Sequence, residues 1–214
     1  MKKRKMIWMG AGLIAVFVLW TVLVSVVDVR AIGPNGSSVG FATLNGYVHD
    51  LTGVNMRLYS ITDWLGLVPI GVALGFAMLG LVQWIERKSL FKVDRGILAL
   101  GGFYVAVMAV YILFEFVVIN YRPTLIDGYL EASYPSSTTM LVMCVMPTAM
   151  MQLHARIKSD VFRRCVLIFI AAFTAFMVIG RLASGVHWLT DIIGGALVSA
   201  GLVITYASAN DIHK

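Results

Sequence analysis

Long runs of apolar residues alternate with short polar segments along most of the chain. A helix needs about 20 mostly apolar residues to cross a bilayer, and these runs reach or approach that length. The pattern predicts an all-α protein, built as a six-span transmembrane helical bundle. The predicted spans are residues 6–27, 64–85, 96–119, 138–153, 165–179 and 192–208. The last three are short, and we expect them to extend into the flanking polar residues.

The first apolar run follows four basic residues, Lys2 to Lys5, as in a secretory signal peptide. It is too long for an ordinary signal sequence and no Ala-x-Ala cleavage site follows, so we expect a retained first span. Residues 28–63 are mixed in character and contain the turn cluster Gly33–Ser38. This segment predicts short interfacial helices outside the membrane. The even spacing of the spans predicts one domain over residues 1–214.

The basic residues fix the orientation of these spans. If the N-terminus is inside, 13 of the 17 Lys and Arg residues fall on the inner side, Lys214 among them, and four on the outer side. Positive charge accumulates on the cytoplasmic side of membrane proteins. The distribution therefore predicts cytoplasmic termini, with the loops after the third and fifth spans outside. The four outer arginines are Arg30, Arg57, Arg122 and Arg181.

Composition agrees with a membrane protein. The chain is 59% hydrophobic and 13% charged, with a mean hydropathy of +0.86, whereas soluble domains carry about 25% charged residues. The net charge of +6 lies in segments between apolar runs, so it does not indicate nucleic-acid binding. Cys144 and Cys165 lack metal-binding spacing, so we expect buried thiols and no metal site.

Three ionisable residues stand close together between the last two spans: Arg181, His187 and Asp191. A helix from Ser184 onward would place His187 and Asp191 one turn apart on one face. A carboxylate there can hold one imidazole nitrogen and leave the other free to react. Arg181 can bind an anion with its planar guanidinium group.

The loop after the third span offers complementary groups. Arg122 and Pro123 stand near its start, and Pro135-Ser136-Ser137 leads into the fourth span. Ser136 is placed to cap that helix, whose free N–H groups attract anions. Two arginines and a helix N-terminus predict a phosphate site, and a histidine held by an aspartate predicts a nucleophile. The reaction class is phosphoryl transfer through a phosphohistidine, with no metal or cofactor.

These residues resemble the motifs of the type 2 phosphatidic acid phosphatase family, which shares its catalytic core with vanadium haloperoxidases. The family pattern is Lys-x6-Arg-Pro, Pro-Ser-Gly-His and Ser-Arg-x5-His-x3-Asp. Here the third motif is matched by Arg181, His187 and Asp191, the first by Arg122-Pro123, and the second by Pro135-Ser136 with Ser137 for Gly. The resemblance implies that His187 is the nucleophile, that Asp191 orients it, and that Arg122, Arg181, Ser136 and Ser137 bind phosphate.

Besides Ser137 for Gly and Gly180 for Ser, two departures from the family pattern matter. Glu115 stands where the family has its phosphate-binding lysine, and Thr138 stands where it has the histidine that protonates the leaving oxygen. Glu115 is expected to pair with an arginine. Tyr121, Asp127 and Glu131 are alternative sources of a proton, and the sequence selects none of them.

The resemblance implies a lipid phosphatase, with a membrane-borne lipid phosphate of polyprenyl diphosphate or phosphatidic acid type as substrate. A missing general acid costs about 10²–10⁴-fold in rate. The loss is smaller for a diphosphate, because the departing phosphate ester has a second pKa of about 6. The rival hypothesis is a protein that binds or carries lipid phosphate without cleaving it. We expect a multi-pass protein of a bacterial plasma membrane with its site outside; the sequence does not indicate an oligomeric state.

Overall fold

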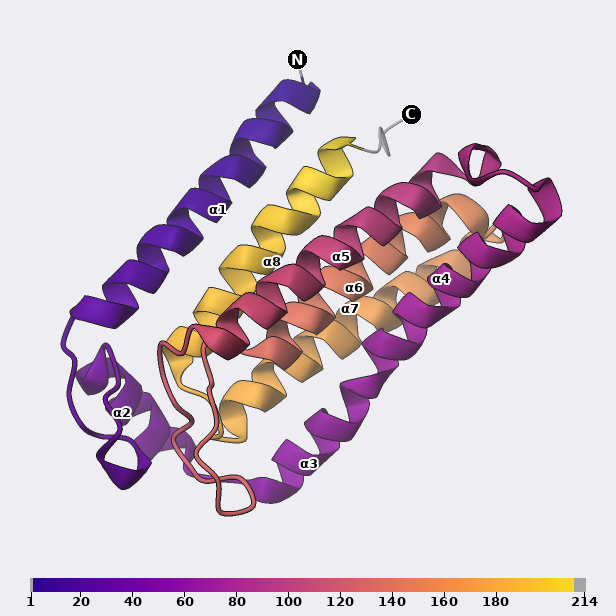
Figure 1. Ribbon diagram of the computed structural model, residues 1–214. Coiled ribbons are helices and arrows are strands. Elements are labelled where there is room, and N and C mark those ends of the chain that lie inside the picture. The colour runs from indigo at the N-terminus through magenta and orange to yellow at the C-terminus, as the bar shows by residue number, and fades with distance from the viewer. Residues whose placement is uncertain (1, 210–214) are drawn as a thin grey trace.

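The structure is a computed structural model, and it describes residues 2–209. Lys214, one of the cations assigned to the inner side, lies outside these residues. The described chain is helical throughout, apart from loops and isolated β-bridges, which confirms the all-α prediction. The long helices lie side by side as a bundle (Figure 1).

The bundle consists of helices that run from one end of the molecule to the other. These are α1 (Lys2–Val26), α4 (Leu67–Arg87), α5 (Arg95–Phe116), α6 (Ser137–Arg156), α7 (Asp160–Ala183) and α8 (Leu189–Ala209). Two shorter helices, α2 (Ala42–Thr52) and α3 (Met56–Leu65), precede α4, and short 3-10 turns lie at Pro34–Gly36 and Leu90–Lys92. Short helices were expected in this segment, and the structure confirms them.

Five helical segments in residues 2–209 are long and apolar enough to cross a membrane, which makes the chain a multi-pass membrane protein. They are α1, α3 with α4, α5, α7 and α8. Helix α6 is not apolar enough to count among these five segments. It lies at the centre of the bundle and packs against α4, α5, α7 and α8. Its buried face carries Thr139, Thr148 and Gln152, and these polar residues lower its hydropathy.

The predicted spans lie within or close to these helices, but their ends differ. The third was expected to reach Ile119, whereas α5 ends at Phe116 because the chain turns there into the loop that carries Arg122. The last three helices extend past their predicted ends into polar residues, as expected; α6 includes both Ser137 and Arg156.

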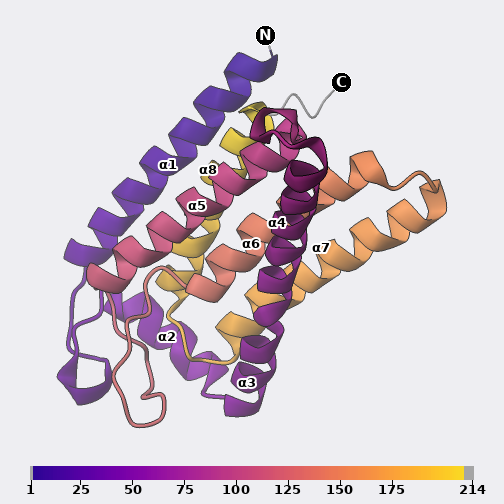
Figure 2. The ribbon, with the colours of Figure 1, turned by 45° about the vertical axis from the view of Figure 1, so that its right-hand side comes forward.

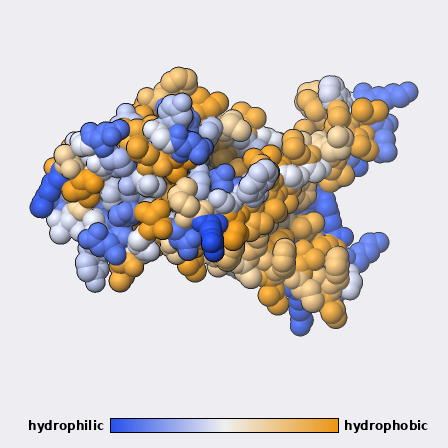
Figure 3. All heavy atoms as spheres, turned by 90° about the horizontal axis from the view of Figure 1, so that it is seen from below, coloured by the Kyte–Doolittle hydropathy of each residue, from blue (hydrophilic) through white to orange (hydrophobic). Residues whose placement is uncertain are grey.

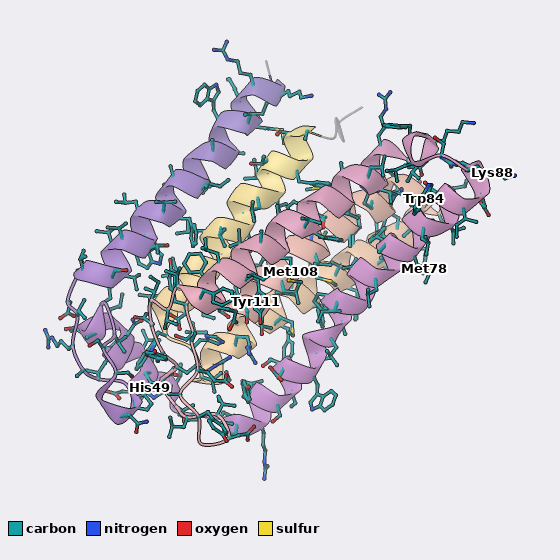
Figure 4. All side chains as sticks on the ribbon, viewed as in Figure 1. His49, Met78, Trp84, Lys88, Met108 and Tyr111 are labelled. Carbon is teal, nitrogen blue, oxygen red and sulfur yellow. The ribbon has the colours of Figure 1, made fainter. Side chains whose placement is uncertain are left out.

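The two ends of the bundle have different structures. The α2–α3 segment, the loop of residues 117–136 and the turn between α7 and α8 meet at the lower end in Figure 1, and the rotated view of Figure 2 agrees. The α4–α5 connection, the start of α1 and the end of α8 lie at the upper end. Figure 4 shows Trp84 and Lys88 at that far end, opposite His49. Viewed from below, polar residues gather over the lower end and the helix flanks are mostly hydrophobic (Figure 3).

Close packing of α1 on α8 anchors the loop that bears Arg122. A Cβ on Gly10 would lie 2.4 Å from Thr205 Oγ1, so the absence of a side chain permits this approach. Tyr134, in the loop, inserts into the core formed by α1, α5, α6 and α8 and stacks on Phe17. Its hydroxyl lies 2.8 Å from Thr21 Oγ1. The end of the loop is thereby fixed next to the N-terminus of α6.

Candidate active site

A turn between α7 and α8 presents His187. No helix runs from Ser184 through His187: α7 ends at Ala183, and α8 begins only at Leu189. Gly185 breaks the helix because it adopts a φ of +67°, and a Cβ there would lie 1.7 Å from the Gly53 carbonyl oxygen. Only glycine fits this left-handed conformation and close approach. The Asn55 N–H also donates to the Ser184 carbonyl at 2.9 Å, so the α2–α3 segment supports the turn.

Asp191 connects the start of α8 to the histidine. Its Oδ2 accepts a hydrogen bond of 3.0 Å from the backbone N–H of Trp188, which precedes the helix. This is the back-reaching half of a helix capping box. The same oxygen lies 3.6 Å from His187 Nδ1. The predicted proximity of His187 and Asp191 therefore arises from helix capping rather than from helical periodicity.

His187 is almost fully buried, and its other ring nitrogen faces Arg122. Nη1 of Arg122 lies 3.1 Å from His187 Nε2. A guanidinium group only donates, so Nε2 must accept, and the ring proton belongs on Nδ1, beside Asp191. Burial lowers the pKa of His187 well below its ordinary value, and the charges of Arg122 and Arg181 lower it further. A neutral imidazole with a lone pair on Nε2 is the form that a nucleophile requires.

Arg122 is held by its own loop. Its backbone N–H donates to the Glu131 carbonyl at 3.0 Å, next to a β-bridge between Tyr121 and Ala132. Its Nε lies 2.9 Å from Glu131 Oε2. Glu131 is one of the three alternative proton sources, and the structure pairs its carboxylate with Arg122, a phosphate-binding candidate.

Arg181 approaches from α7 and is 1% exposed. Its Nη1 lies 3.4 Å from Thr62 Oγ1 and 3.4 Å from Asp63 Oδ1, both on α3. The Tyr59 ring lies 4.9 Å from the Arg181 guanidinium carbon and 6.0 Å from that of Arg122, so both arginines face one aromatic ring. Nε of Arg181 has no hydrogen-bond partner. A buried guanidinium with an unused donor is suited to bind an anion.

The N-terminus of α6 completes the arrangement. Ser136 caps this helix by accepting from the Thr139 N–H at 3.4 Å, which confirms the predicted cap. Its own N–H donates to the Asp191 carbonyl at 3.0 Å. Ser137 lines a cavity of about 360 Å³ that also contains Arg122 and His187. The structure thus brings together the groups of three separate motifs.

The two departures from the family pattern occupy different places. Thr138 does not line this cavity; a Cβ on Gly66 would lie 3.7 Å from its methyl group, which places Thr138 beside the α3–α4 junction. Glu115 does line the cavity, from α5. The expected pairing of Glu115 with an arginine is wrong for the described residues, because Arg122 pairs with Glu131 and Arg181 with Asp63.

Two buried asparagines stand behind Asp191, and neither was predicted. Asn120 Nδ2 donates to Asp191 Oδ1 at 3.3 Å and to Thr190 Oγ1 at 3.4 Å. Asn45, on α2, donates to Thr190 Oγ1 at 2.9 Å and to the Gly40 carbonyl at 2.8 Å, and accepts from the Thr190 N–H at 3.2 Å. Asn45 therefore ties α2 to the first turn of α8. The local sequence signal of this role is that Asn45, a polar residue, lies on the buried face of the short helix α2.

Replacing Asn45 by alanine is expected to lower the free energy of unfolding by about 1–3 kcal/mol, because the Thr190 N–H and the Gly40 carbonyl lose a buried partner. Denaturant unfolding in detergent measures the change. Leu44→Ala is the matched control, since Leu44 is an exposed neighbour on the same helix; surface changes of this kind alter stability by about 0.5 kcal/mol or less. Equal losses in the two variants would contradict the assigned role of Asn45.

Comparison with known proteins gives two matches. The sequence profile of the PAP2 superfamily matches residues 99–212, which include Arg122, the α6 N-terminus and the His187 turn. The crystal structure of a transmembrane PAP2-type phosphatidylglycerolphosphate phosphatase from Bacillus subtilis is similar in fold. It shares 20% sequence identity at a TM-score of 0.55, with 94% of each chain covered. A search of curated proteins gives no match.

Proposed function

Because the chain belongs to the PAP2 superfamily, we propose that it is a membrane lipid phosphatase that acts through a phosphohistidine at His187. The observation that carries the proposal is the contact series from Arg122 to His187 Nε2 and from His187 Nδ1 to Asp191. It leaves one nitrogen neutral and nucleophilic beside a cation that can bind the phosphate under attack.

The proposed reaction has two steps. In the first, the Nε2 lone pair attacks phosphorus, the ester P–O bond breaks, and the lipid oxygen leaves and takes up a proton from water. Asp191 stabilises the Nδ1–H of the ring as positive charge develops. In the second, water attacks the phosphohistidine, inorganic phosphate leaves, and neutral His187 is restored. Arg122, Arg181 and the α6 N-terminus with Ser136 and Ser137 stabilise the phosphoryl oxygens.

Arg122 must move for the first step to occur, because its Nη1 occupies the approach to Nε2. The ion pair with Glu131 supplies a pivot: Nε can stay bound while Nη1 turns from the imidazole to a phosphate oxygen. The arginine thereby changes from a partner of the nucleophile to a partner of the substrate.

The proposal includes one membrane domain over residues 1–214, with six crossings and cytoplasmic termini. Helix α6 supplies the crossing that hydropathy alone leaves out, since it runs between the loop at one end and the α6–α7 connection at the other. With this orientation the site lies on the outer face, and the lipid substrate reaches it from the outer leaflet. A bacterial plasma membrane is the proposed location, in line with the bacterial relative in fold.

Thr138 limits which substrates are cleaved well. Without a histidine at this position no general acid stands ready, and an alkoxide is a poor leaving group. A lipid diphosphate avoids the problem, because a phosphate ester with a second pKa of about 6 leaves without a proton. Thr138 therefore favours a substrate whose leaving group is already stabilised.

A substrate panel tests the function. Purified protein in mixed micelles would be given phosphatidic acid, phosphatidylglycerol phosphate, and polyprenyl mono- and diphosphates, with release of inorganic phosphate as the readout. We expect release from at least one of them, and faster release from the diphosphate than from phosphatidic acid, by about tenfold or more.

Two results would contradict parts of this account. Equal rates on phosphatidic acid and the diphosphate would show that Thr138 does not limit the leaving group. Saturable binding of every lipid without release of phosphate would favour a lipid-phosphate binder or carrier over an enzyme.

A further inference from the structure

A second cavity lies between α4 and α5, at the end of the bundle opposite the candidate active site. Its volume is about 400 Å³, and its lining is almost entirely apolar. Trp84 belongs to this lining and lies at the far end in Figure 4, next to the α4–α5 connection, which contributes Leu90 and Val93. Along α5 the lining runs from Ile97 to Tyr104, a length of about 10 Å. The cavity is therefore an apolar groove along two helices, and the proposed reaction does not use it.

Missing side chains keep this groove open. Gly101 and Gly102 line it, and a Cβ on either glycine would meet no atom within 4 Å. Gly80 differs, because a Cβ there would lie 2.9 Å from Ile97 Cγ2, so this glycine permits the close contact between α4 and α5. Glycine is unfavourable inside a helix relative to alanine. Packing within residues 2–209 does not account for Gly101 and Gly102, whereas an occupant from outside the chain does.

The connection beside the groove carries unpaired positive charge. Residues 86–95 contain four basic and two acidic side chains. Asp94 is already engaged, because it accepts a hydrogen bond from Gln83 at 2.9 Å and pairs with Arg87 at 3.1 Å. Glu86 is exposed and opposes the remaining cations. Three exposed cations have no side-chain hydrogen bond or ion pair in the described part of the chain: Lys88, Lys92 and Arg95.

Exposed apolar side chains accompany these cations. Phe91 is 95% exposed, and Trp84 and Leu90 are each 49% exposed. Tryptophan is typical of the membrane–water interface, and Lys and Arg clusters on the cytoplasmic side of a transmembrane helix attract anionic lipid headgroups. The proposed orientation places this end of the bundle in the cytoplasm. Groove and cations together match a ligand with an apolar chain and an anionic head.

We propose that one anionic phospholipid of the inner leaflet binds here, with an acyl chain in the groove along Gly101 and Gly102 and its headgroup at the cations of the α4–α5 connection. A zwitterionic lipid has a similar chain but no net charge to offset the surplus of positive charge, so the site selects anionic lipids. An apolar helix of a second copy would fill the groove and supply no anion. The site lies far from His187, so this inference does not depend on the phosphatase function.

Lipid retention measured by native mass spectrometry tests the proposal. Protein in mild detergent would be incubated with equal amounts of phosphatidylglycerol and phosphatidylcholine that carry the same acyl chains. We expect one retained lipid per protein and a preference for phosphatidylglycerol of about tenfold or more, since each cation near a membrane surface contributes about fivefold. In Lys88→Gln combined with Lys92→Gln the preference should disappear, because Glu86 then balances Arg95. Gly101→Leu should remove the retained lipid, because the new side chain occupies the groove.

Matched controls come from the same end of the bundle, from another helix and from the active site. Lys158→Gln combined with Arg164→Gln removes two exposed cations around the α6–α7 connection. Gly12→Leu adds a side chain at an open glycine of α1. Both controls should keep the wild-type retention and preference. Arg122→Gln, at the opposite end, should also keep them, which separates this site from lipid bound in the catalytic cavity.

Four results would overturn the inference. They are equal retention of the two lipids by wild type, a preference that survives Lys88→Gln with Lys92→Gln, a preference that Lys158→Gln with Arg164→Gln abolishes equally, and retention that Arg122→Gln abolishes. A dimer in place of the lipid adduct, lost in Gly101→Leu, would assign the groove to a second copy instead. Because Lys88 and Lys92 are exposed, their removal tests the site even where Gly101→Leu does not fold.

Discussion

Replacement of His187 by glutamine is expected to lower phosphate release by about 10⁴-fold or more, whichever lipid phosphate is used. Glutamine keeps a polar side chain of similar length but has no nucleophilic nitrogen, so the covalent intermediate cannot form. The residual rate would come from the arginines alone. Release of inorganic phosphate from the best substrate of the panel, at saturating concentration, measures the effect on kcat.

His154→Gln is the control for this substitution, because His154 is exposed in the last turn of α6, at the far end from the site. It should retain near wild-type activity. A folded His187→Gln protein with more than about a tenth of the wild-type rate would rule out His187 as the nucleophile.

The second large effect is expected at Arg181. Its replacement by lysine keeps the charge but removes the planar fork, its unused Nε donor and the contact with the Tyr59 ring. We expect kcat/KM to fall by about 10²–10³-fold, as for loss of a donor that stabilises the transition state. Steady-state kinetics on the same substrate separates the effect on kcat from the effect on KM.

Arg57→Lys provides the comparison, since Arg57 is an exposed arginine on α3, the helix that contacts Arg181. It should change kcat/KM by less than about twofold. If Arg181→Lys behaves like Arg57→Lys while its thermal unfolding in detergent is unchanged, Arg181 does not bind the phosphate.

Apolar patterning predicted the helices well because membrane helices are selected for length and hydropathy. It failed where another contact determines the helix end. Ile119 is apolar, yet α5 ends before it, since Asn120 must turn inward to reach Asp191 and Thr190. The apolar run also predicted the fourth span, residues 138–153, but α6 continues to Arg156.

For the site, motif spacing predicted Arg122, Arg181, His187 and Asp191, and the structure places Arg122, His187 and Asp191 in one contact series. It did not identify Tyr59, Asp63 or Asn45. These residues belong to the α2–α3 segment, more than 100 residues before their partners in α7 and α8. Contacts between residues so far apart in the chain produce no periodic pattern or fixed motif spacing in the local sequence. No helix forms from Ser184 through His187 for a similar reason, because Gly185 adopts a positive φ and packs closely against Gly53, which is distant in sequence.

The central claim is a covalent phosphohistidine at His187, and trapping that intermediate tests it most directly. Protein would be mixed with a lipid substrate labelled with ³²P in the phosphate, quenched within milliseconds, and digested for peptide mapping. We predict a label that is labile to acid and stable to alkali, located on the peptide containing His187, present in the His154→Gln control and absent from His187→Gln. Turnover of the substrate with no label on the protein, or with the label unchanged in His187→Gln, would contradict the account.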